Sequence, residues 1–120
     1  MRPPRDRDSK LFFRLLFWAA AVFALVMALI PQPPPLPGNP SDKVQHALAF
    51  ATLSVLGILA YPRLSLLKLL VALSLFGAFI EVAQAIPSLH RDSDQLDWLT
   101  DTIACAVVLL GIHWSRRRTL

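Results

Sequence analysis

Four long apolar stretches, each ended by proline or charged residues, limit how this chain can fold more than any other feature. They cover residues 11–30, 44–61, 64–86 and 98–114. Each is close to the ~20 residues that a helix needs to cross ~30 Å of hydrocarbon. A backbone inside lipid must satisfy its own hydrogen bonds, so these stretches are predicted to be helices. The sequence therefore predicts an all-α fold, a four-helix transmembrane bundle.

The composition agrees with a membrane protein. Of the 120 residues, 55% are apolar and 17% are charged, whereas soluble domains carry about 25% charged residues. A glycine-rich phosphate loop, an H-E-x-x-H motif and paired C-x-x-C motifs do not occur in the sequence. The single cysteine excludes an intrachain disulfide. A chain of 120 residues has room for one domain. The absence of these motifs argues against the common nucleotide-binding enzymes.

The distribution of basic residues predicts the orientation. Residues 1–14, the connection near residues 63–68 and residues 116–118 hold ten of the twelve Lys and Arg residues. Short cytoplasmic segments carry this excess in membrane proteins, so both termini are predicted to be cytoplasmic. The cytoplasmic face then sums to +8 and the outer face to −4. We predict a multi-pass membrane protein.

The segments outside the spans have simple explanations. Residues 1–10 and 115–120 are basic tails that would lie against anionic lipid, so no nucleic-acid partner is predicted. Residues 31–43 are rich in proline and would form a stiff outer connection. Residues 11–30 are longer than the apolar core of a secretory signal and lack a small-x-small cleavage site, which favours an uncleaved anchor helix.

Polar residues gather at the predicted outer ends of the last three helices. Asp42 and His46 are four residues apart, and Asp97 and Asp101 repeat that spacing, which places each pair on one helical face. An acid that faces lipid costs about 2.5 kcal/mol or more at a helix centre, so we expect these faces to meet in one ligand-binding pocket. The candidate pocket residues are Asp42, Lys43, His46, Glu81, Gln84, Arg91, Asp94, Asp97 and Asp101.

Several of these residues also have a structural explanation. Asp42 with Gln45 fits a capping box, and Asp94 could cap the last helix. Glu81 has no such explanation, because the helix dipole disfavours an acid near a C-terminal end. We therefore expect Glu81 to hold a proton or to lie against Arg91, Lys43 or His46.

The order and spacing of these residues resemble a known family. Asp42-Lys43-x-x-His46-x-x-x-Phe50 opens one helix and Glu81-x-x-Gln84 closes the next. Arg91-x-x-Asp94-x-x-Asp97-x-x-x-Asp101 then crosses a loop into the last helix. The pattern is similar to the VanZ family of small bacterial membrane proteins. Residues 44–114 would be the VanZ-like region, with residues 11–30 as its preceding anchor helix.

The sequence departs from the family pattern at two positions, where it has Asp101 and Ala104 in place of an asparagine and a glycine. The resemblance implies a link to low-level teicoplanin resistance, by a mechanism that is not established in the family. Most family members have no assigned activity.

Three classes of function fit these observations. The first is a non-enzymatic envelope protein whose outer pocket binds a lipid-linked or amphiphilic ligand, with Arg91 as an anchor for phosphate or carboxylate. The alternative is a metal-assisted hydrolase or transferase that acts on a lipid headgroup. A divalent metal would use His46, Glu81, Asp97 and Asp101, although no tight ligand spacing predicts it. A proton-coupled transporter is the third class. No cofactor is firmly predicted, and the sequence does not indicate an oligomeric state.

Overall fold

The computed structural model describes residues 5–30, 38, 41–89 and 95–118. Its regular elements are α1 (Arg5–Leu29), α2 (Asp42–Ala60), α3 (Leu66–Gln84), a short 3-10 helix η1 (Pro87–Leu89) and α4 (Gln95–Arg118). All four α-helices are long and apolar enough to cross a membrane. The predicted all-helical fold with four spans is confirmed over the described residues.

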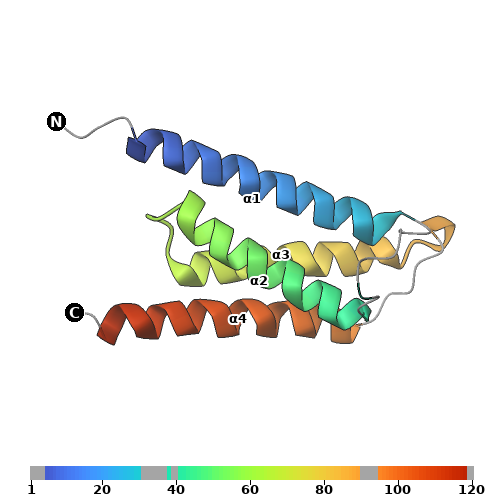
Figure 1. Cartoon of the computed structure of the whole chain (residues 1–120). Coiled ribbons are helices and arrows are strands. Elements are labelled where there is room, and N and C mark those ends of the chain that lie inside the picture. The colour runs from blue at the N-terminus through green and yellow to red at the C-terminus, as the bar shows by residue number, and fades with distance from the viewer. Residues whose placement is uncertain (1–4, 31–37, 39–40, 90–94, 119–120) are drawn as a thin grey trace.

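The helices run up and down the bundle, so the start of α1 and the end of α4 lie at the same end (Figure 1). We call this the basic end, which also holds the α2–α3 connection. The opposite, polar end holds the start of α2, the end of α3 and the start of α4. α4 packs against both α2 and α3, and α1 packs mainly against α2.

Short-range signals set several helix ends. Ser41 caps α2, and its side chain accepts a hydrogen bond from the Val44 backbone nitrogen at 3.3 Å. The predicted capping box of Asp42 with Gln45 is therefore wrong by one residue, since the serine before Asp42 is the cap. Ser65 caps α3 by accepting from the Lys68 nitrogen at 3.1 Å. The predicted cap Asp94 lies outside the described residues.

The helices extend beyond several of the apolar stretches. α1 begins at Arg5 and α4 continues to Arg118, so parts of the predicted basic tails are helical. Charged turns at a helix end lie in the headgroup region, where they can be solvated. The start of α3 at Leu66 follows the turn that contains Pro62, which cannot extend α2.

The packed interior is small, and the outer surface is apolar. Phe50, Leu53 and Ile80 are at most 1% exposed and lie in the core with Cys105. Large apolar side chains are exposed along all four helices, for example Val82 at 73%. A surface of this kind is unstable in water and is expected where lipid is the solvent. The fold is that of a multi-pass membrane protein.

Candidate functional site

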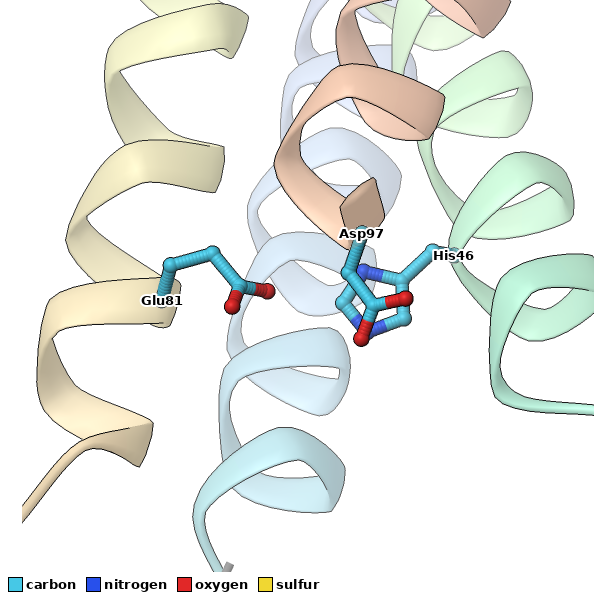
Figure 2. A group of neighbouring side chains, drawn as sticks. All are labelled: His46, Glu81 and Asp97. Carbon is cyan, nitrogen blue, oxygen red and sulfur yellow. The ribbon is translucent and has the colours of Figure 1, made fainter. Parts of the chain in front are cut away.

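Three helices bring polar side chains together at the polar end of the bundle. His46 lies one turn into α2, Glu81 lies one turn before the end of α3, and Asp97 lies in the first turn of α4. Figure 2 shows the three side chains directed toward one another from their separate helices. One nitrogen or oxygen atom from each lies within 4.8 Å of the others.

A hydrogen bond to Asp101 fixes the imidazole of His46. The Nδ1 atom of His46 lies 2.8 Å from Oδ1 of Asp101, which is completely buried. When Asp101 is ionised it only accepts hydrogen bonds, and the Nδ1–H group of His46 is then the donor. This contact leaves Nε2 as the atom that faces the other members of the cluster, where it lies 4.0 Å from Oδ2 of Asp97.

Gly77 makes room for the Asp101 carboxylate. A Cβ atom on Gly77 would lie 2.9 Å from Oδ2 of Asp101, which is closer than side chains normally approach. The face of α3 that carries Gly77 therefore lies directly against α4 at this point. Because glycine has no side chain, the buried carboxylate of Asp101 fits between the two helices at this position.

Two hydrogen bonds hold α3 and α4 together beside the cluster. Trp98 Nε1 donates to the Ser74 carbonyl oxygen at 3.1 Å, and the Ser74 and Thr102 hydroxyl oxygens lie 3.0 Å apart. Polar contacts between helices contribute about 0.6 kcal/mol on average within membranes. They fix the register in which Glu81 meets Asp97.

The charges of the cluster are unequal. Glu81, Asp97 and Asp101 supply three carboxyl groups, all at most 7% exposed. Lys43 forms an ion pair with one of these acids, since its Nζ lies 3.3 Å from Oδ1 of Asp97. The Lys43 side chain is half exposed, at 49%, so solvent weakens its effect. A buried set of groups with this excess of acid is neutralised either by holding protons or by a further cation.

The donor set suits a divalent ion. His46 Nε2 and one oxygen each from Glu81 and Asp97 give one nitrogen and two oxygens. Ligand atoms on one ion lie about 3 to 4.3 Å apart when each bond is about 2.1 Å, so small side-chain movements would complete the site. Asp101 would then be the carboxylate that holds the ligating histidine, an arrangement common in metal proteins.

The structure thus brings together His46, Glu81, Asp97 and Asp101, and Lys43 joins them through Asp97. Gln84 bonds to α1: its Nε2 donates to the carbonyl oxygen of Ala28 at 3.0 Å, and its side chain is 2% exposed. Arg91, Asp94 and the side chain of Asp42 lie outside the described residues.

Sequence reasoning missed Tyr61 at the basic end. The guanidinium carbon of Arg14 lies 4.7 Å from the centre of the Tyr61 ring, and Arg14 Nε donates to the Ala60 carbonyl oxygen at 3.0 Å. A tyrosine at the end of a span is the signal that could have found this contact, since such residues mark the headgroup level.

The chain matches no family model, no curated protein and no solved structure.

Proposed function

We propose that this chain is a VanZ-like, non-enzymatic protein of the bacterial cytoplasmic membrane that binds an amphiphilic, phosphate-bearing ligand at its polar end. A divalent cation held by His46, Glu81 and Asp97 would link the protein to that phosphate. The observation that carries the proposal is the buried cluster of acids around one imidazole, built from three membrane-spanning helices.

The proposed orientation has both termini in the cytoplasm and the polar end outside. Residues 1–14, 63–68 and 116–118 hold ten of the twelve basic residues. Short segments rich in Lys and Arg stay in the cytoplasm when membrane proteins insert. The acid-rich cluster would then open toward the outer headgroup layer. Lipid-linked intermediates of the envelope expose phosphate groups at that depth.

Charge complementarity supports the cation in this proposal. Three buried carboxyl groups would repel a phosphate that approached alone. An ion with three protein ligands keeps other coordination positions open, and phosphate oxygens suit them. The carboxylate-rich set suits Mg²⁺, Ca²⁺ and Mn²⁺, and among these three the nitrogen of His46 favours Mn²⁺, because Mg²⁺ and Ca²⁺ prefer oxygen ligands alone.

The test is a titration of Mn²⁺ into the purified full chain in detergent, followed by electron paramagnetic resonance. We expect one bound ion per chain and an affinity at least tenfold lower in Glu81→Gln, which keeps the shape and removes the charge. Asp8→Asn is the matched control, because Asp8 is exposed on α1. Equal affinities in the two variants would contradict the proposal.

A cellular test addresses the ligand and the VanZ resemblance. Expression of the chain in a susceptible strain should raise the teicoplanin concentration that stops growth, and Glu81→Gln should abolish this effect while it still accumulates in the membrane. If both versions leave susceptibility unchanged, the resistance role is wrong, although Mn²⁺ binding would stand as a separate result.

The pair formed by His46 and Asp101 favours a second candidate, a headgroup hydrolase. A histidine whose Nδ1–H is held by a buried carboxylate is oriented to accept a proton at Nε2. Because this candidate needs Nε2 free of metal, it predicts phosphate release from phosphatidic acid in mixed micelles without added Mn²⁺, and loss of that activity in His46→Gln. Binding without release would favour the non-enzymatic function.

A further inference from the structure

Side chains of α1 and of the α2–α3 connection line a cavity. These two segments meet at the basic end of the bundle, opposite the polar end (Figure 1). The volume of the cavity is about 530 Å³, within the range of small-ligand sites. The lining residues are Lys10, Arg14, Tyr61, Pro62, Arg63 and Leu64. Three of the six are basic and none is acidic.

The arginine in this cavity is held in position. Arg14 Nε donates to the carbonyl oxygen of Ala60, the last residue of α2, whose carbonyl has no partner within the helix. The Tyr61 ring beneath the guanidinium is fixed in turn, because its hydroxyl oxygen accepts from Trp18 Nε1 at 2.9 Å. A guanidinium has five N–H donors, so this contact leaves the four terminal ones, the fork that fits two phosphate oxygens.

We propose that this cavity binds the phosphate group of an anionic phospholipid, with Arg14 as the oriented donor and Lys10 and Arg63 as further cations. Basic pockets between membrane helices suit such headgroups. Trp18 and Tyr61 mark the headgroup level, and Leu64 provides an apolar wall for the first acyl carbons. Phosphate groups at this depth belong to lipids, which favours a lipid over free phosphate. The proposal does not depend on the cation site at the polar end.

The test is native mass spectrometry of the full chain in detergent, titrated with phosphatidylglycerol or, as the uncharged comparison, phosphatidylcholine. Lys10→Gln with Arg63→Gln removes two cations and leaves the Arg14 contacts in place. Both cations would contact the bound phosphate directly, so the pair should weaken phosphatidylglycerol binding roughly tenfold or more, whereas a cation outside the cavity contributes only screened attraction. A second variant, Arg14→Lys, keeps the charge and removes the fork, and should also weaken binding.

The matched control is Lys68→Gln with Arg117→Gln. These two residues are exposed at the same end and outside the cavity, so binding should stay within about twofold of the original chain. Equal losses in the two double variants would overturn the proposal, since they would indicate general attraction of charge. Inorganic phosphate that competes as well as phosphatidylglycerol would overturn the assignment to a lipid.

Discussion

Gly77→Ala tests the close contact on which the polar cluster depends. The new methyl carbon would lie 2.9 Å from Oδ2 of Asp101 and 3.5 Å from the Phe50 ring. Asp101 is completely buried and is held by His46, so it cannot move aside without lengthening that hydrogen bond. Overpacking of this kind costs about 1–3 kcal/mol, and replacement of a helical glycine by alanine returns about 0.5–1 kcal/mol.

Gly111→Ala is the matched control, because Gly111 is also helical and a Cβ atom there meets nothing within 4 Å. It should stabilise the chain by about 0.5–1 kcal/mol, so the two variants should differ by about 1–3 kcal/mol, the overpacking cost alone. Circular dichroism during unfolding in mixed micelles with dodecyl sulfate measures the difference. Stabilities within about 0.5 kcal/mol of each other would refute the reasoning.

A double variant separates the contact from other effects of the methyl group. In an Asp101→Ala background the carboxylate oxygen is gone, so Gly77→Ala should then behave like Gly111→Ala. If Gly77→Ala destabilises both backgrounds equally, its effect does not pass through Asp101.

Three further predictions follow from other contacts. Gln84→Leu removes the hydrogen bond to Ala28 that joins α3 to α1, and should lower the free energy of unfolding by about 1 kcal/mol in the same assay; no change would mean that this bond does not hold α1. Lys43→Gln should change stability by less than about 1 kcal/mol, because Lys43 is half exposed, yet raise Mn²⁺ affinity by removing a competing positive charge, and weaker Mn²⁺ binding would show that Lys43 supports the site. A cytoplasm-active reporter fused after Leu120 should be active, and activity of a periplasm-dependent reporter there would reverse the proposed orientation.

The spans were predictable because their length and apolar character are properties of the sequence alone. The convergence of His46, Glu81 and Asp97 could also be anticipated, since acids on membrane helices avoid lipid by facing the bundle interior, where they can meet a partner or water. The position of Gln84 could not be predicted. It lies three residues after Glu81, and that offset rotates its side chain around the helix enough to reach α1. Whether the side chain meets α1 depends on where α1 packs, which the sequence does not show.

Local competition explains the other difference. Ser41 and Asp42 are both residue types that cap helices well. In the structure Ser41 is the cap of α2, and the sequence alone does not distinguish the two. The contact between Arg14 and Tyr61 joins residues 47 positions apart in the sequence, and no periodic pattern marks such a pair.

Pulsed electron paramagnetic resonance of the Mn²⁺-loaded full chain tests the central claim most directly, because coupling to a nitrogen-14 nucleus reports an imidazole bound to the metal. The account predicts this coupling in the original chain and in His113→Gln, whose histidine is exposed near the opposite end, and its loss in His46→Gln. Coupling that persists in His46→Gln, or a chain that binds no Mn²⁺ at all, would contradict the claim that the polar cluster holds a divalent cation.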